Sequence, residues 1–122
     1  MTIPQGVAHV EAAIALAARA ADRIGELEDL DDGWQADAVG KLSATCDLLR
    51  VTLDRFYLKT KVSLPFARRC QEEARAVDGL LEEGAAVAET GGQARLTAAI
   101  ERLAQAARVL DERSLMQGMA IT

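Results

Sequence analysis

The stretch TIPQGVAHVEAAIALAARAADRI, residues 2–24, joins a helix-capping signal to an apolar stripe. Thr2 is followed three residues later by Gln5, the capping-box spacing, in which the two side chains satisfy backbone N–H groups at the start of a helix. Apolar residues then recur at steps of three and four, which places them on one face of a helix. They are Ile3, Val7, Val10, Ile14, Ala17, Ala21 and Ile24. This segment therefore predicts a long helix that buries a single face.

Capping side chains precede three further runs of helical period. They are Asp32, Ser63 and Thr90, and two of them again have glutamine at the third following position. The expected helices span about residues 3–28, 33–61, 64–89 and 91–115. Short connections between long helices are expected to join antiparallel neighbours. The sequence therefore predicts an all-α, single-domain, up-down-up-down four-helix bundle over residues 1–117, followed by a flexible tail at 118–122.

The composition is that of one acidic, alanine-rich domain. The 122 residues carry a net charge of −5 and half of them are apolar, but no apolar run is long enough for a signal peptide or a membrane span. The two cysteines lack CxxC spacing, so we expect free thiols in a reducing cytoplasm. Arginine outnumbers lysine eleven to three, a bias typical of high-GC bacterial genomes.

The second expected helix differs from the others because it carries apolar residues on two faces. Leu42 and Leu49 belong to its core-facing stripe, whereas Val51, Leu58 and Val62 fall near the opposite pole. Apolar residues on an outer face are either scattered exposed aliphatics or contact area for another molecule. A homo-oligomer formed through this face is one expectation.

Residues 50–69 concentrate positive charge. The six basic residues are Arg50, Arg55, Lys59, Lys61, Arg68 and Arg69, and the one acid is Asp54. This local balance of +5 leaves −10 for the rest of the chain. Arg68 and Arg69 fall in the first turns of a helix, where the macrodipole disfavours cations. Pairing with Glu72 and Glu73 would offset that cost, and so would an acidic partner or a bound anion.

Residue types that commonly carry catalysis or bind metals are sparse. His9 is the only histidine and is expected on the solvent side of the first helix, so no zinc, di-iron or Ser-His-Asp site is expected. Cys46 and Cys70 are expected about 12 Å apart along the bundle axis, as packing residues beyond disulfide reach. Arg69 with Glu73 is the charged pair expected to be partly buried at the bundle edge.

These features predict a non-enzymatic protein-interaction module, such as an adaptor, small chaperone or regulator, that binds an acidic and apolar protein surface through the second helix and the turn after it. The expected contact residues are Val51, Arg55, Tyr57, Leu58, Lys59, Lys61, Val62, Arg68 and Arg69. No cofactor, metal or membrane contact is expected, and the net charge disfavours nucleic acid. Two alternatives stay open: a bundle that binds or transforms a small anion at the arginine cluster, and a purely structural homo-oligomer.

Overall fold

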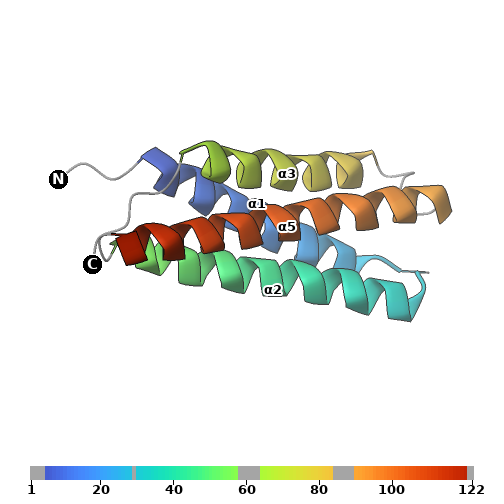
Figure 1. Cartoon of the computed structure of the whole chain (residues 1–122). Coiled ribbons are helices and arrows are strands. Elements are labelled where there is room, and N and C mark those ends of the chain that lie inside the picture. The colour runs from blue at the N-terminus through green and yellow to red at the C-terminus, as the bar shows by residue number, and fades with distance from the viewer. Residues whose placement is uncertain (1–4, 29, 58–63, 84–89, 121–122) are drawn as a thin grey trace.

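A computed structural model describes residues 5–28, 30–57, 64–83 and 90–120, and it consists of four helices. They are α1 (Gln5–Glu26), α2 (Asp32–Tyr57), α3 (Leu64–Glu82) and α5 (Thr90–Ala120) (Figure 1). The predicted all-α four-helix bundle is confirmed. In the described part of the chain, no helix is both long and apolar enough to cross a membrane.

The last helix is longer than the sequence predicts. α5 continues to Ala120, past the expected end near residue 115 and into the segment 118–122 that we expect to be a flexible tail. Gly118 does not end the helix, because one glycine lowers helix stability by only about 1 kcal/mol relative to alanine.

The turn between α1 and α2 corrects the predicted cap by one residue. Asp31, and not Asp32, is the capping side chain, since its Oδ1 accepts a hydrogen bond from the backbone N of Trp34 at 2.9 Å. Gln35 does not complete a capping box. Its Nε2 instead donates to the carbonyl oxygens of Ile24 at 2.7 Å and Leu27 at 3.0 Å, which satisfies the end of α1 and fastens it to the start of α2.

Contacts between α1 and its neighbours fix their relative directions. Toward α2, Gln35 bonds Ile24, and the thiol of Cys46 lies 3.7 Å from the carbonyl oxygen of Ile14, so the two helices are antiparallel. Toward α3, His9 contacts Gln71 and Arg23 contacts Asp78, so residue numbers rise together and these two helices are parallel (Figure 1).

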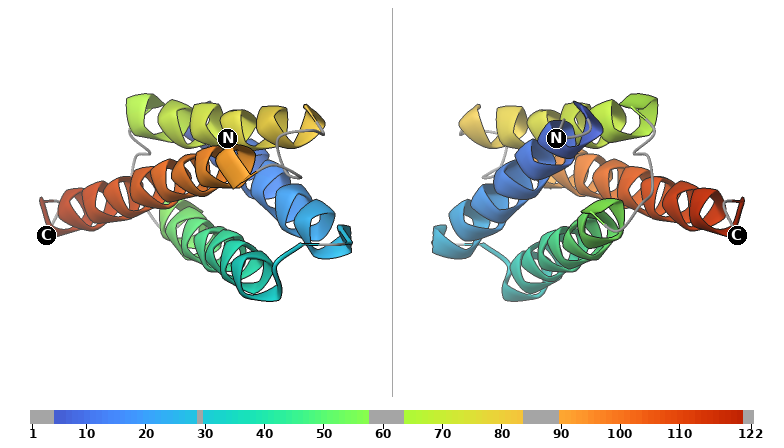
Figure 2. Two further views of the ribbon diagram at one scale, coloured as in Figure 1. Left: turned by 90° about the vertical axis from the view of Figure 1, so that its right-hand side faces the viewer. Right: turned by 90° about the vertical axis from the view of Figure 1, so that its left-hand side faces the viewer.

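α5 repeats this pattern on the other side of the bundle. It runs parallel to α2, because Trp34 contacts Thr97 and Thr52 contacts Asp111. It runs antiparallel to α3, because Glu73 contacts Arg102, whereas Phe66, earlier in α3, contacts Arg113, later in α5. The chain therefore reverses direction at each connection. Seen from its ends, the bundle has helices that fan out and do not share one axis (Figure 2).

The helix neighbours differ from the expected arrangement. α1 and α5 each pack against both α2 and α3, whereas over the described residues α2 does not approach α3 and α1 does not approach α5. The expectation that each short connection joins neighbouring helices is wrong for α2 and α3. Six residues can extend about 20 Å, and helices pack about 10 Å apart, so residues 58–63 are long enough to cross a bundle diagonal.

The core is divided between small and large side chains. α1 and α3 bury several alanines between them, namely Ala13, Ala17, Ala20, Ala67 and Ala74, and these two helices pack against each other. Larger buried residues dominate α2 and α5, including Leu42, Leu49, Leu96, Ile100, Leu103 and Leu110. Small residues let helix backbones approach closely, so this half of the core has little room for added volume.

Replacing a buried alanine of α3 by leucine tests this close approach. Ala74 is fully buried, so we expect Ala74→Leu to lower the free energy of unfolding by about 1–3 kcal/mol through overpacking. Chemical denaturation followed by Trp34 fluorescence measures the change. Ala76→Leu, at an exposed position of the same helix, is the matched control and should change stability by less than about 0.5 kcal/mol. Equal effects of the two substitutions would contradict the packing described.

Candidate functional site

A groove of about 480 Å³ lies between the first half of α3 and the middle of α5. Its lining residues are Pro65, Phe66, Arg69, Glu72, Arg102, Gln105, Ala106 and Val109, and we call it the arginine groove. Most of the lining surface is apolar. The antiparallel packing of α3 on α5 is what brings these two sequence segments together.

Two arginines of this groove share one carboxylate. Glu73 Oε1 lies 3.3 Å from Nε of Arg69, and Glu73 Oε2 lies 3.3 Å from Nε of Arg102. The Glu73 side chain is only 15% exposed, whereas those of Arg69 and Arg102 are 66% and 56% exposed. The predicted partial burial of the Arg69–Glu73 pair is therefore confirmed for the glutamate. Glu72 also lines the groove, so these two arginines and two glutamates balance in formal charge. The positive excess comes from Arg113, which lies over the Phe66 ring at one end.

A third arginine covers the aromatic end of the groove. The guanidinium carbon of Arg113 lies 5.1 Å from the centroid of the half-buried Phe66 ring, within cation–π range. Arg68, one residue before Arg69, is exposed and forms no ion pair with the described residues. The local pairing expected for the two arginines is thus present for Arg69 and absent for Arg68 in the described part of the chain.

Sequence reasoning missed Arg102 and Arg113 as members of this site. They lie about thirty to fifty residues beyond the basic segment, on a helix whose register against α3 the sequence does not fix. One signal in the sequence could have indicated them: the up-down order of the helices places the later part of α5 beside the start of α3.

The structure describes part of the predicted contact surface. Val51 is 49% exposed, as expected for the outer face of α2, and Arg68 and Arg69 are both exposed. The backbone positions of Arg55 and Tyr57 belong to the last turns of α2. The remaining predicted contact residues, Leu58, Lys59, Lys61 and Val62, lie outside the described residues.

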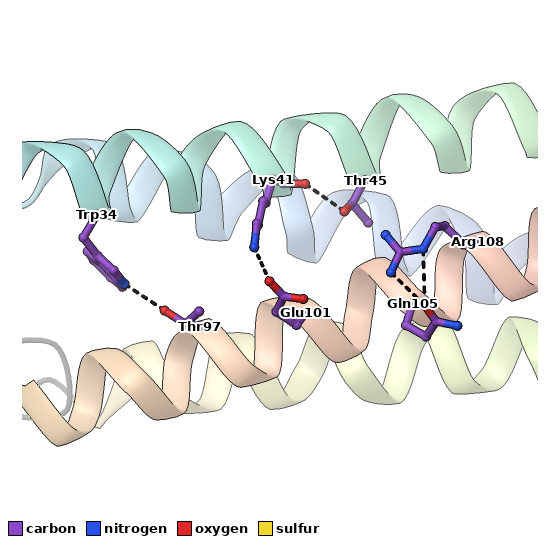
Figure 3. A network of polar contacts seen from close by, with 7 residues as sticks. All are labelled: Trp34, Lys41, Thr45, Thr97, Glu101, Gln105 and Arg108. Atoms are coloured by element: carbon purple, nitrogen blue, oxygen red, sulfur yellow. Dashed lines mark hydrogen bonds and ion pairs between the residues drawn. The ribbon is translucent and has the colours of Figure 1, made fainter.

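The seam between α2 and α5 is polar along its outer edge (Figure 3). Nε1 of Trp34 donates to Oγ1 of Thr97 at 2.8 Å, and Lys41 donates to Glu101, which lowers the pKa of that carboxyl. A second hollow of about 220 Å³ follows the same seam, and Ala104 is part of its lining. α5 is therefore flanked by a groove on each side.

Two buried hydroxyl groups form hydrogen bonds deeper along this seam. Oγ1 of the buried Thr52 lies 2.8 Å from the carbonyl oxygen of Leu48 and 2.9 Å from Oδ1 of Asp111. Oγ of the buried Ser114 donates to the backbone carbonyl of Asp111 at 2.7 Å. Satisfied buried hydroxyls of this kind fix how two helices align.

His9 does not lie on the solvent side of α1, which corrects the prediction. It is half-buried, and its Nδ1 is hydrogen-bonded to Oε1 of Gln71 on α3. The reason is that α3 packs against α1, so the His9 ring lies at the interface between these two helices. Across the described residues, no group of three His, Cys, Asp or Glu side chains is arranged to hold a metal ion.

Both cysteines are buried free thiols, as expected of packing residues. Burial, with a smaller contribution from the Glu73 carboxylate, raises the pKa of the Cys70 thiol to about 12. Burial is also the main cause that raises the pKa of Cys46, although Arg50 acts in the opposite direction. A thiol with a raised pKa stays protonated near neutral pH and is a poor nucleophile. Neither cysteine is therefore suited to catalysis in the native fold.

Comparison with known proteins identifies no relative of this chain: no protein family, curated protein or solved structure matches it.

The Cys70 thiol gives an alkaline dependence of stability. The folded state keeps this proton until about pH 12, whereas an unfolded thiol loses it near 9.0. The folded state therefore binds more protons between these values, and the free energy of unfolding should fall as the pH rises from 9 toward 12. Urea denaturation at a series of pH values measures this slope.

Cys70→Ala provides the comparison. The variant is expected to be less stable at every pH because of the lost packing, but its stability should fall less steeply above pH 9.0. Parallel pH profiles for the wild type and the variant would contradict the assignment.

Proposed function

We propose that this protein is a non-enzymatic interaction module whose arginine groove binds an acidic, amphipathic segment of a partner protein. The observation that carries the proposal is the combination of an apolar groove with guanidinium groups on both of its walls. Arg69 stands on α3, Arg102 stands on α5, and Phe66 contributes aromatic surface at one end.

The shape of the groove favours a segment of protein chain. It follows two packed helices and is open to solvent, and its floor is largely apolar. An amphipathic helix can lay its apolar face into such a groove, and acidic side chains on the edges of that helix would then meet the arginines. The alternative ligand, a small inorganic anion, gains nothing from apolar contact area.

The charges would contribute mainly to encounter rate and orientation. Opposite charges on two partners steer association, whereas buried apolar contact supplies most of the affinity. The predicted contact residues also include basic side chains at the end of α2 and in the turn after it, such as Lys59 and Lys61. They belong to the same basic stretch of sequence, residues 50–69, as Arg69. They remain predicted contributors, together with exposed Arg68.

We also propose the cytoplasm as the compartment. Support comes from the two free cysteine thiols, Cys46 and Cys70, since disulfides are rare where glutathione and thioredoxin keep thiols reduced.

A synthetic peptide tests the binding proposal. The probe is an amphipathic helix with leucine at positions i, i+4 and i+7 and glutamate on the flanks, and the control peptide has lysine in place of every glutamate. We expect the acidic peptide to bind and to shift backbone NMR resonances around Phe66 and Ala106, because these line the groove. The lysine peptide should bind at least about tenfold more weakly, a difference of about 1.4 kcal/mol.

Charge-reversed variants locate the binding site. Arg102→Glu should weaken the acidic peptide by about tenfold or more, whereas Arg75→Glu, an equal charge change at an exposed position on α3 outside the groove lining, should have little effect. Equal losses in both variants would show non-specific attraction. Stabilisation by phosphate or a free dicarboxylate that Arg68→Ala and Arg69→Ala cancel would instead support the small-anion alternative.

Glu73 is expected to position the two arginines, so its loss should weaken peptide binding. If Glu73 only competed with the peptide's carboxylates, Glu73→Gln would tighten binding. We expect about fivefold weaker binding, because two long side chains lose the anchor that orders them, and ordering each one costs about 0.5–1.5 kcal/mol.

Glu72→Gln is the matched control for this variant. It removes an exposed carboxylate from the same groove. The two ion pairs that hold Arg69 and Arg102 are formed by Glu73 and do not involve Glu72. Its affinity for the acidic peptide should stay the same or rise. Tighter binding by Glu73→Gln, measured by fluorescence anisotropy, would contradict the positioning role.

A further inference from the structure

The outer face of α2 carries a stripe that the packing of the monomer explains only in part, because one member, Leu48, packs partly against the core and the other three are exposed. It consists of Gly40, Ala44, Leu48 and Val51, spaced at steps of three and four. Gly40 and Ala44 are exposed, Val51 is 49% exposed, and Leu48 is half-buried. These residues face away from α1 and beside the α2–α5 hollow, whose lining includes Ala44, Leu48 and Ala104.

Gly40 is the residue of this stripe that most needs a reason. It lies inside α2, where glycine is one of the least favourable residues. A Cβ at this position would meet nothing within 4 Å, so no contact in the monomer requires a glycine here. A close approach by another molecule would supply the missing reason.

The order of sizes along the stripe is complementary to itself in one orientation only. The small residues Gly40 and Ala44 come first, and the large residues Leu48 and Val51 follow. Two copies of α2 packed antiparallel place the large half of one helix against the small half of the other. A parallel pairing would instead oppose large residues to large and leave small residues opposite small, with poor packing.

The charges that bracket the stripe select the same orientation. Asp37 lies one turn before Gly40 and is exposed, and position 55, one turn beyond Val51 on the same helical face, is an arginine. An antiparallel pairing centred at the level of residue 46 brings position 37 of each copy opposite position 55 of the other. A parallel pairing would set like charges against each other.

We propose that a second copy of this chain docks on the outer face of α2, in an antiparallel arrangement about a two-fold axis that crosses this face at the level of residue 46. Because such an interface is isologous, each contact occurs twice: Leu48 with Ala44 of the second copy, Val51 near Gly40, and Asp37 with Arg55. Residue 51 of the second copy comes opposite residue 41, beside the α2–α5 hollow. This interface does not include the arginine groove, so it holds whether or not that groove binds a partner.

Analytical ultracentrifugation of the full chain tests the interface. The wild type is expected to sediment as a dimer of twice 13.0 kDa. Val51→Glu should raise the dimer dissociation constant at least about tenfold while far-UV circular dichroism stays unchanged. Leu27→Glu is the matched control, because Leu27 is, among the residues whose burial the structure describes, the other exposed large hydrophobic one, and it should remain dimeric. A monomeric wild type, or a fully dimeric Val51→Glu, would overturn the proposal.

Charge exchange tests the orientation. Asp37→Arg and Arg55→Asp should each be monomeric, because each places like charges in contact. An equimolar mixture of the two variants should form a heterodimer, since every contact between positions 37 and 55 then joins opposite charges. The doubly substituted chain should again form a homodimer. Failure of the mixture to associate, or unchanged dimerisation of either single variant, would exclude the antiparallel arrangement.

Discussion

The position of α5 between α2 and α3 is the constraint on which the arginine groove and the hollow along the α2–α5 seam both depend. Its parallel seam with α2 is fixed by hydrogen bonds from Trp34 to Thr97 and between Thr52 and Asp111. Its antiparallel contact with α3 brings Arg102 to the carboxylate of Glu73, which also pairs with Arg69 near the start of α3. Over the described residues α1 packs against α3 and not against α5, and α5 carries a groove on each flank.

The helical period predicted the buried faces, because side-chain direction along a helix is a local property. Leu42 and Leu49 are buried and Val51 is exposed, as expected. The choice of helix neighbours is not a local property. A short connection limits how far apart two helices can lie, but it does not decide whether they are adjacent or diagonally opposed in the bundle. That choice moved His9 into contact with α3 and assembled the arginine groove from residues that the sequence keeps apart, such as Arg102.

Charge sharing in the arginine groove differs from an ordinary surface ion pair. Exposed pairs contribute about 0–1 kcal/mol to stability, because water and salt screen them. Glu73 is more deeply placed than either partner, so it orders Arg69 and Arg102 without neutralising both. The result is a pair of positioned cations beside apolar surface, which would lower the entropic cost of binding the acidic segment that we propose.

The two proposed interfaces lie on different faces, and their combination has a functional consequence. The groove uses the face that α5 shares with α3, whereas self-association uses the outside of α2. A dimer through α2 therefore leaves two arginine grooves available, related by the two-fold axis. A partner that carries two acidic segments would engage both, and its second binding event would be intramolecular, so modest affinity at each groove would suffice for a stable complex.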